Sequence, residues 1–326
     1  MERAYLPRRD RVRGRRMIPE QETFDGTWPF RACYTEAAGF RQHFVDEGPR
    51  TGPAIVLLHG EPTWGYLWRH LIDPLSRTHR VVVPDHMGFG KSATPADRGY
   101  LAGEHVANLE ALLVGELDLD RITLVLHYWG GPIGTGFALR HPERIERIVA
   151  TNTVLPLGLP GYDELMAGNL ADSAWFQWAG AAQAEGRLEE VLGNAGHTVT
   201  HLMLALQTIT RPENVTPTWI RAYSGHFTSR AECRGVIRFP QQLVAPAPDD
   251  PAPTPDPSAV ATLRAKPAML VEGMRDTALL PRYVIPAFRA AYPQAPVIEL
   301  ADVGHFPPED APEALLALIE LFLATT

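Results

Sequence analysis

Short apolar runs that alternate with helix-forming stretches constrain the fold of this chain more than any other feature. The runs are apolar throughout, as expected for strands that are covered on both faces. Strands that alternate with helices are typical of βαβ units and of a mostly parallel sheet flanked by helices. The sequence predicts strands over residues 54–58, 80–84, 122–126, 147–151, 268–272 and 297–300, and helices over 65–76, 101–117, 132–140, 281–291 and 311–323.

The middle of the chain has a different character. Residues 155–243 contain no buried-strand run, but they contain helical stretches and a cluster of aromatic side chains. In residues 245–258, six of fourteen positions are proline, which excludes a sheet strand and favours a semi-rigid polyproline connector. The pattern therefore predicts an α/β core interrupted by a helical cap, with the active site between the two.

We expect five segments along the chain. The first sixteen residues include seven arginines and show no apolar periodicity, which indicates a flexible tail. A role for this tail at a nucleic acid or another anionic surface is the less favoured alternative. The expected segments are a basic tail at 1–22, the first part of the core at 23–154, the cap at 155–243, a proline-rich connector at 244–260 and the second part of the core at 261–326.

Charge and composition limit the function classes. The net charge of −8 argues against nucleic acid as the main partner. No window of eighteen residues is uninterruptedly apolar, so we expect no membrane-spanning helix. Two cysteines, Cys33 and Cys233, are too few for a disulfide framework and favour a cytoplasmic location. Of the 30 basic residues only Lys91 and Lys266 are lysines, which suggests a GC-rich bacterial genome. We expect a monomer or a homodimer.

Chemically active side chains follow several of the predicted strands. His59–Trp64 follows the first strand, Pro84–Ser92 the second, and His127–Gly131 the third, where the chain runs straight into a helix. Asp276 and His305 come late in the chain, each after a further expected strand. Because ligands bind at the carboxyl ends of strands in open parallel sheets, we expect these segments to meet at one site.

These segments have the order of the α/β-hydrolase landmarks: an oxyanion loop, a nucleophile elbow, an acid and a histidine. The sequence resembles haloalkane dehalogenases and the related epoxide hydrolases over residues 40–326, most closely in His59–Trp64 and Pro84–Ser92. The resemblance implies an α/β-hydrolase fold with a helical cap. It also implies that Asp276 and His305 are catalytic, and that the backbone N–H groups of Glu61 and Trp129 form the oxyanion hole.

The resemblance breaks at the elbow. Dehalogenases read Gln-Asp-Trp-Gly-Gly there, with aspartate as the nucleophile, whereas this chain has Tyr128 in that position and contains no Gly-x-Ser-x-Gly. An aspartyl ester has a carbonyl that water attacks, so the enzyme is freed. If Tyr128 displaced a halide, the product would be an aryl alkyl ether without such a carbonyl. Covalent dehalogenation at this residue is therefore chemically disfavoured.

Three hypotheses remain for this site. The preferred one is an enzyme in which His305, oriented by Asp276, acts as general base, and Tyr128 donates a hydrogen bond to an oxygen of an apolar epoxide, lactone or ester. In the second, Tyr128 is the acyl-accepting nucleophile of an esterase or lactonase. In the third, the chain is a catalytically inactive homologue that binds a ligand.

The resemblance also assigns expectations to further side chains. Trp129 matches the first halide-binding tryptophan of the dehalogenases. We expect the second in the cap, at Trp178, with Trp175 as the alternate. Tyr223 is a candidate for the cap tyrosine that polarises an epoxide in epoxide hydrolases. In the core, we expect His59 to order the oxyanion loop, a cis peptide at Glu61–Pro62, His127 to point away from the pocket and Asp85 to form a turn.

Two other patterns carry less weight. Gly90-Lys91-Ser92 ends like a phosphate-binding loop, but Asp85 stands where the first glycine of that motif is required. His197 and His201 have the spacing of metal ligands on one helix face, but the glutamate of zincins and a third ligand are absent. We therefore expect no metal and no cofactor, and a small apolar molecule as substrate.

Overall fold

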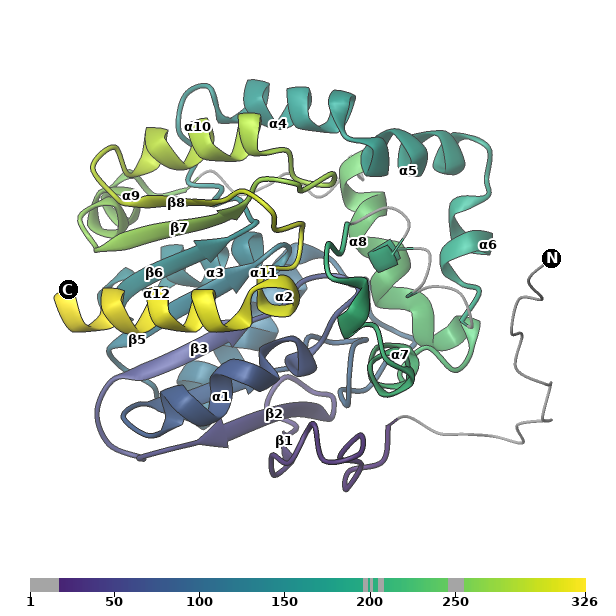
Figure 1. Cartoon of the computed structure of the whole chain (residues 1–326), viewed down its shortest axis with the longest axis horizontal. Helices are drawn as coiled ribbons and strands as arrows, with labels where there is room; N and C mark the ends of the chain where they lie inside the picture. The colour runs from purple at the N-terminus through teal and green to yellow at the C-terminus, as the bar shows by residue number, and fades with distance from the viewer. Residues whose placement is uncertain (1–17, 196–198, 200–201, 205–207, 246–254) are drawn as a thin grey trace.

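The six predicted apolar runs form the parallel part of one eight-stranded sheet (Figure 1). In this computed structural model, which describes residues 18–326 except 196–198, 200–201, 205–207 and 246–254, the strand order is β1-β2-β4-β3-β5-β6-β7-β8. Strand β2 pairs antiparallel with β1 and β4, and all other neighbours are parallel. The strands are β1 (Cys33–Thr35), β2 (Gln42–Glu47), β3 (Ala54–Leu58), β4 (Arg80–Pro84), β5 (Ile122–His127), β6 (Ile145–Thr151), β7 (Ala268–Gly273) and β8 (Val297–Leu300).

The predicted strands are confirmed to within two residues at each end. The sequence does not predict β1 and β2, because β1 has only three residues and β2 carries buried polar side chains. In β2, the Asp46 carboxylate accepts two bonds from Arg80 of β4, both at 2.9 Å, and His43 lies 2.8 Å from Asp85. These pairs satisfy the polar groups of a strand that has no apolar run to reveal it.

Helices cover both faces of the sheet. In Figure 1, α1 and α12 lie in front of it and α2 and α3 lie behind it. The predicted helices are confirmed, although the first begins as a 3-10 turn and the second ends as a π-helical turn. They are the turn Gly65–Trp68 with α1 (Arg69–Ser76), α2 (Ala102–Glu110) with the turn Ala111–Glu116, α3 (Gly130–Arg140), α10 (Pro281–Ala291) and α12 (Pro312–Thr325), to which the structure adds α11 (Pro307–Asp310).

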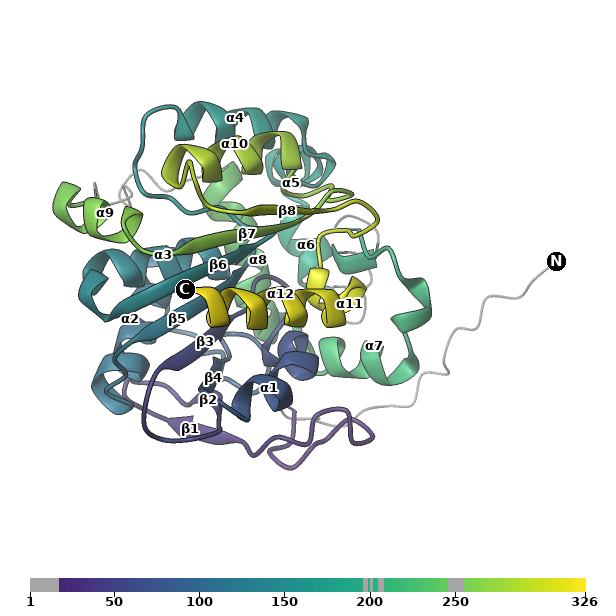
Figure 2. The same ribbon diagram turned by 60° about the vertical axis from the view of Figure 1, so that its left-hand side comes forward.

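The described residues between β6 and β7 are mostly helical. Helices α5 to α8 lie beside the end of the sheet on the right of Figure 1, whereas α4 packs along α10 in both views (Figures 1 and 2). This arrangement encloses the space in which the strand-end residues lie. The helices are α4 (Tyr162–Asp172), α5 (Ala174–Ala184), α6 (Leu188–Leu192), α7 (Pro217–Ser224), α8 (Arg234–Val244) and α9 (Pro257–Arg264).

The first described residues are held on the core. Ile18 is buried beside Gly225, and the Lys91 ammonium donates to the backbone oxygens of Glu20 and Glu22 at 2.8 and 3.1 Å. Residues 18–22 therefore differ from the flexible tail that the sequence indicates for 1–22, because an apolar anchor and a buried lysine fix them. Residues 1–17 lie outside the described part of the chain.

The expected proline-rich connector is partly helical. Helix α9 begins at Pro257, where the Asp256 carboxylate accepts a hydrogen bond from the Ser258 N–H at 2.8 Å. A proline at the first helical position and an aspartate cap favour a helix start, which outweighs the proline content of this stretch. Among the described residues, no helix is long and apolar enough to cross a membrane.

Candidate active site

The turn between β5 and α3 holds Tyr128 in an unusual backbone conformation. Its φ of 48° lies in the left-handed region, which costs a non-glycine residue about 1–3 kcal/mol. The Tyr128 N–H donates to the Asn152 oxygen at 3.2 Å, and the Thr153 hydroxyl donates to the Tyr128 oxygen at 2.5 Å. Gly60 permits the close approach of its loop, since a Cβ there would lie 2.4 Å from the Tyr128 Cβ. The turn therefore presents one fixed side chain, a phenol, at the end of β5.

Asp276 and His305 form a buried hydrogen-bonded pair. His305 Nδ1 lies 2.7 Å from Asp276 Oδ2, and both side chains are fully buried. The carboxylate accepts three further bonds, from the Asn152 amide at 2.8 Å and from the N–H groups of Ala278 and Leu279 at 2.7 and 3.0 Å. Because a carboxylate held in this way only accepts, we assign the imidazole proton to Nδ1. His305 Nε2 is then free to accept a proton.

Asn152 is a site residue that the sequence analysis missed. It directly follows β6, and its φ of 42° is a conformation that asparagine tolerates better than most residues. Its Nδ2 donates to Asp276, and its Oδ1 accepts from the Gly273 N–H at 2.9 Å, so it joins the ends of β6 and β7. The sequence feature that indicates Asn152 as a site residue is its position directly after the expected strand 147–151.

The Tyr128 phenol is held by a tryptophan rather than by the histidine. Trp175 Nε1 donates to the phenol oxygen at 3.0 Å. The His305 ring lies edge-on to the phenol, with 4.6 Å between ring centroids and 85° between planes. Among the described residues, no hydrogen bond joins phenol and imidazole. Burial, and next the neighbouring Glu61, raise the pKa of Tyr128 well above its usual range, so the phenol stays neutral.

Four buried polar atoms around Tyr128 lack a hydrogen-bond partner in the described part of the chain. They are both carboxyl oxygens of Glu61, Nε1 of Trp129 and Nε2 of His305. Burial raises the pKa of Glu61 well above its usual range, which keeps the carboxyl neutral. The Trp129 N–H faces this carboxyl and partly offsets the rise without meeting hydrogen-bond geometry. Since buried polar groups are normally paired, the set marks the place of a polar ligand group or water.

An apolar cavity of about 250 Å³ adjoins the elbow. Tyr128 and Trp129 lie in its wall, and Tyr162, Met166 and Leu170, spaced four residues apart on α4, line another side. The lining suits a small apolar molecule whose polar group lies toward the phenol. The other lining residues are Pro132, Val154, Pro156, Asn169, Phe176, Leu243 and Leu279.

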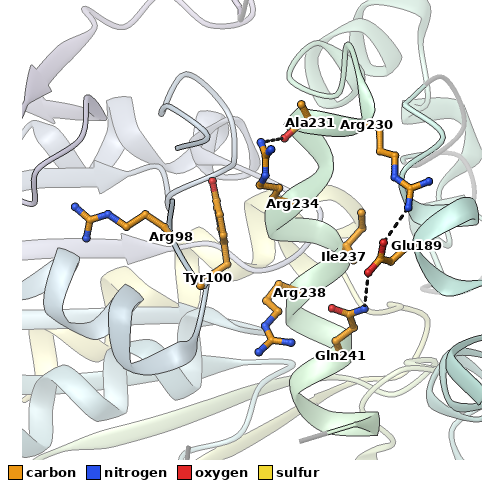
Figure 3. Close-up of a pocket in the computed structure, with 10 residues that line it drawn as sticks. Arg98, Tyr100, Glu189, Arg230, Ala231, Arg234, Ile237, Arg238 and Gln241 are labelled. Carbon is orange, nitrogen blue, oxygen red and sulfur yellow. Dashed lines mark hydrogen bonds and ion pairs between the residues drawn. The ribbon is translucent and has the colours of Figure 1, made fainter. Parts of the chain in front are cut away.

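A larger cavity, of about 460 Å³, lies over α8 and has a charged lining (Figure 3). Four arginines contribute to it, but their charges do not converge. Arg230 pairs with Glu189 at 2.8 Å, and the Arg98 guanidinium donates to the Ala38 oxygen at 3.2 Å and points away from α8 in Figure 3. The elbow residues Tyr128 and Trp129 line the apolar cavity but not this one, whereas the acid–histidine pair lines neither. The smaller apolar cavity is therefore the candidate active site.

Comparison with known proteins agrees with this geometry. Residues 53–312 match the family model described as alpha/beta hydrolase fold. The chain belongs to the α/β-hydrolase family. Among curated proteins, this α/β-hydrolase is 32% identical over 300 residues to haloalkane dehalogenase 2 of Mycobacterium tuberculosis. The matched region covers 90% of this chain and 94% of that protein. The chain is therefore haloalkane dehalogenase-like.

Two further similarities widen the comparison. The chain is 33% identical over 295 residues to a cis-3-alkyl-4-alkyloxetan-2-one decarboxylase of Xanthomonas campestris, covering 87% of this chain and 93% of the relative. The solved tetrameric haloalkane dehalogenase DpaA from Paraglaciecola agarilytica matches 97% of this chain and 99% of its own, with a TM-score of 0.67 and 24% identity. The latter similarity shows the fold, and the expected α/β-hydrolase fold class is confirmed.

In this α/β-hydrolase, Trp175 rather than Trp178 contacts the elbow. The Trp175 indole N–H lies on the Tyr128 phenol, whereas Trp178 is half-buried and stacks on the Trp175 ring, with 5.5 Å between centroids and 18° between planes. Neither tryptophan lines the apolar cavity. The orientation of α5 turns Trp175 toward the strand ends, and a halide-binding role for Trp178 or Trp175 stays a prediction.

Tyr223 does not reach the candidate site. It is fully buried in α7, and its hydroxyl donates to the Glu309 carboxylate. Glu309 also accepts two bonds from Arg69, at 2.5 and 2.8 Å, and one from Trp219 Nε1 at 3.0 Å. The expectation that Tyr223 polarises a substrate oxygen is therefore corrected, because its hydroxyl belongs to a charged network that ties α7 to α1 and α11.

The oxyanion loop has the ordering contacts that the sequence predicts. His59 Nε2 accepts a backbone N–H at 2.9 Å, and Glu61–Pro62 is a cis peptide. Asp85 is buried and accepts the backbone N–H of Lys91, in its own turn, at 2.8 Å and that of Gly65, which precedes α1, at 2.9 Å. His127 Nε2 lies 2.8 Å from the backbone oxygen of His305, and the His127 ring does not line the apolar cavity.

Metal ligands are not gathered in the described part of the chain. No group of three or more histidine, cysteine, aspartate or glutamate side chains is arranged there to hold an ion. His197 and His201, whose spacing drew attention in the sequence, lie outside the described residues.

Proposed function

We propose that this α/β-hydrolase opens an epoxide or a lactone of an apolar small molecule with water, without a covalent intermediate. The observation that carries the proposal is His305 Nε2, which is buried and unpartnered among the described residues while Nδ1 is held by Asp276 at 2.7 Å. An imidazole oriented in this way accepts a proton from water as the water attacks.

The other groups at the site stabilise the substrate oxygen. The neutral Tyr128 phenol accepts a bond from Trp175, so its own proton is available to the substrate. The backbone N–H groups of Glu61 and Trp129 form the oxyanion hole. In support of this, the oxyanion loop and the elbow lie against each other, since a Cβ on Gly60 would lie 2.8 Å from the Trp129 nitrogen.

The alkyl-enzyme route of the dehalogenases is disfavoured at this site. Tyr128 occupies the turn where the resemblance places an aspartate, and a tyrosyl ether offers water no carbonyl. The acyl-enzyme route of an esterase or lactonase is the second candidate, because a phenyl ester does hydrolyse. This route receives less support, because the phenol oxygen is hydrogen-bonded to Trp175 and not to His305. The raised pKa of the phenol also opposes formation of the nucleophilic phenolate.

Two observations favour a strained cyclic oxygen as the reacting group. The cavity beside the phenol is almost wholly apolar, so it selects a hydrocarbon body with one polar function. A relative that matches 87% of this chain is named for an oxetan-2-one, which is a four-membered lactone. We therefore propose small apolar lactones and epoxides as the first substrates to screen.

The decisive experiment compares wild type, His305→Ala and Tyr128→Phe on panels of epoxides, lactones and esters. We expect His305→Ala to abolish turnover and Tyr128→Phe to lower it, whereas His79→Ala, outside the site, leaves it unchanged. A single turnover in ¹⁸O-water should place the label in the first product formed. Intact-mass spectra should show no adduct on the enzyme. Wild-type rates in His305→Ala and Tyr128→Phe would refute the proposal.

The same preparations distinguish the alternatives. An acyl adduct that is absent from Tyr128→Phe would establish the acyl-enzyme route. Tight binding of the panel compounds without any product would identify an inactive ligand-binding homologue. Halide release from chloro- and bromoalkanes by wild type would show that another group is the nucleophile, whereas release only by Tyr128→Asp would show that one residue changed the chemistry of the site.

A further inference from the structure

We infer that the side-chain carboxyl of Glu61 is a catalytic group, the acid that protonates the oxygen released when the substrate ring opens; this inference rests on the proposed function. The resemblance to the hydrolases implies a role only for the backbone N–H of this residue, in the oxyanion hole. The structure adds the side chain, which is fully buried and has both oxygens unpartnered among the described residues.

Most other buried carboxyl groups of the described chain have partners. Asp46 and Glu309 accept bonds from arginines, whereas Asp85, Asp276 and Asp310 accept bonds from backbone N–H groups. A buried polar group without a partner lowers stability, and it does so more strongly if it is charged. The fold therefore retains at Glu61 an unfavourable group that packing does not explain, directly beside the elbow.

Glu61 lies on the oxyanion loop, beside the elbow that carries Tyr128. Its loop adjoins the elbow, since a Cβ on the preceding Gly60 would lie 2.4 Å from the Tyr128 Cβ and 2.8 Å from the Trp129 nitrogen. The His305 ring contacts the Tyr128 phenol edge-on, with 4.6 Å between ring centroids. In the proposed reaction, a substrate oxygen that accepts a bond from Tyr128 takes its proton from Glu61, and the attacking water gives its proton to His305.

The two neutral donors at the site differ in acid strength. Burial raises the pKa of the Tyr128 phenol from an already high starting value of 10.0, whereas the pKa of the Glu61 carboxyl rises from 4.5. The carboxyl starts as the far stronger acid and is kept protonated by burial. Tyr128 is therefore the hydrogen-bond donor, and Glu61 is the group that transfers its proton.

The resulting step is balanced in atoms and charge. Water forms a bond to a ring carbon while one of its protons moves to His305 Nε2. The ring carbon–oxygen bond breaks, its electron pair stays on oxygen, and that oxygen takes the proton of Glu61. After the diol leaves, the proton on His305 returns through solvent to the Glu61 carboxylate, so water is the only reagent consumed.

The test compares wild type with Glu61→Gln, which keeps the size and hydrogen-bonding capacity of the side chain but has no proton to transfer. With 1,2-epoxyhexane, whose alkoxide is a poor leaving group, we expect kcat to fall about 100-fold or more, the range of general acid catalysis. With 4-nitrophenyl butanoate, whose leaving phenolate needs no proton, we expect a loss of less than about 10-fold. A purely structural role would lower both rates alike.

The pH profile provides a second readout. Wild-type kcat/KM should fall at high pH as the acid loses its proton, and Glu61→Gln should lack this alkaline limb. Glu272→Gln is the matched control, because Glu272 is also fully buried with both oxygens unpartnered among the described residues, but it lies at the end of β7 beside Asp276. Glu272→Gln should keep the fall of kcat/KM at high pH, and it should not slow the epoxide more than the nitrophenyl ester.

Infrared difference spectra test the protonation state without turnover. The spectrum of wild type minus Glu61→Gln should contain a carboxylic-acid C=O band at neutral pH, and a carboxylate band in its place would overturn the inference. An active wild type with unchanged kcat in Glu61→Gln also overturns it and leaves the proposed function intact. A wild type that hydrolyses no epoxide, lactone or ester removes the proposed function, and this inference with it.

Discussion

Trp175 donates its indole N–H to the phenol oxygen of Tyr128 at 3.0 Å, and this bond joins helix α5 to the elbow at the end of β5. Both side chains are buried, so no solvent competes for the bond. Because the phenol oxygen accepts from Trp175, its own proton points elsewhere. The contact therefore orients the donor on which the proposed chemistry depends.

Trp175→Phe tests this orientation. The variant keeps an aromatic ring but leaves the buried phenol oxygen unpaired, so we expect the free energy of unfolding to fall by about 1–3 kcal/mol. We also expect kcat to fall about 10-fold, because the phenol is no longer held in one orientation. A 10-fold fall corresponds to a loss of roughly 1.4 kcal/mol of transition-state stabilisation. Trp178→Phe, which leaves the bond to Tyr128 in place, is the control, and equal losses in both variants would show that packing alone is at work.

Asn152→Gly tests the support of the catalytic pair. Glycine adopts the positive φ of this position without strain, so the variant removes the four side-chain hydrogen bonds of Asn152, of which the one to Asp276 is to a charged group. Hydrogen bonds to a charged group contribute about 1.5–3 kcal/mol, so kcat should fall roughly 10- to 100-fold with KM nearly unchanged. Steady-state kinetics check this, with Asn214→Gly as the control. A change confined to KM would contradict the positioning role.

Glu309→Gln tests the network that fastens α7 to the core. Removing one partner of a buried ion pair leaves the Arg69 charge uncompensated and costs about 3–5 kcal/mol. We expect a lower midpoint in urea and faster proteolysis between residues 208 and 245. Glu313→Gln changes an exposed glutamate nearby and should do neither. Loss of activity without loss of stability would assign Glu309 to the site instead.

Strands β3 to β8 can be predicted from local patterns in the sequence, whereas the acid–histidine pair is implied by the resemblance to the hydrolases. Apolar runs mark β3 to β8, and residues directly after such runs must meet at one edge of a parallel sheet. Strand β2 does not follow, because its buried polar groups are satisfied by partners such as Arg80 that are remote in sequence.

The orientation of side chains in the helical segment is also beyond the sequence. Trp175 and Trp178 are three residues apart, which places them only about 60° apart around a helix, so the pattern alone does not say which one faces the elbow. Tyr223 has its partner Glu309 86 residues away in the chain, and no local signal indicates that contact. The sequence therefore predicts which segments meet at the strand ends, but it does not predict which of two equivalent residues a tertiary contact selects.

A buried histidine outside the site makes the stability of the fold sensitive to acid. His105 is buried beside Phe239, at 4.8 Å between ring centroids, and neither of its ring nitrogens has a partner among the described residues. Burial lowers its pKa from 6.5 to about 3. Between these values the unfolded chain binds the proton and the folded chain does not. Stability is therefore fully present above about pH 6.5 and is lost as the pH falls toward 3.

We expect His105→Phe to flatten this dependence, because phenylalanine fills the same aromatic site without a proton to bind. The contribution of His105 amounts to ~3 kcal/mol between pH 7 and pH 4. Urea unfolding at a series of pH values should show wild type losing that much more stability than the variant over this interval. The carboxylates titrate in both proteins, so the difference isolates the histidine. A constant difference across the interval would mean that His105 is protonated as readily in the folded core as in the unfolded chain.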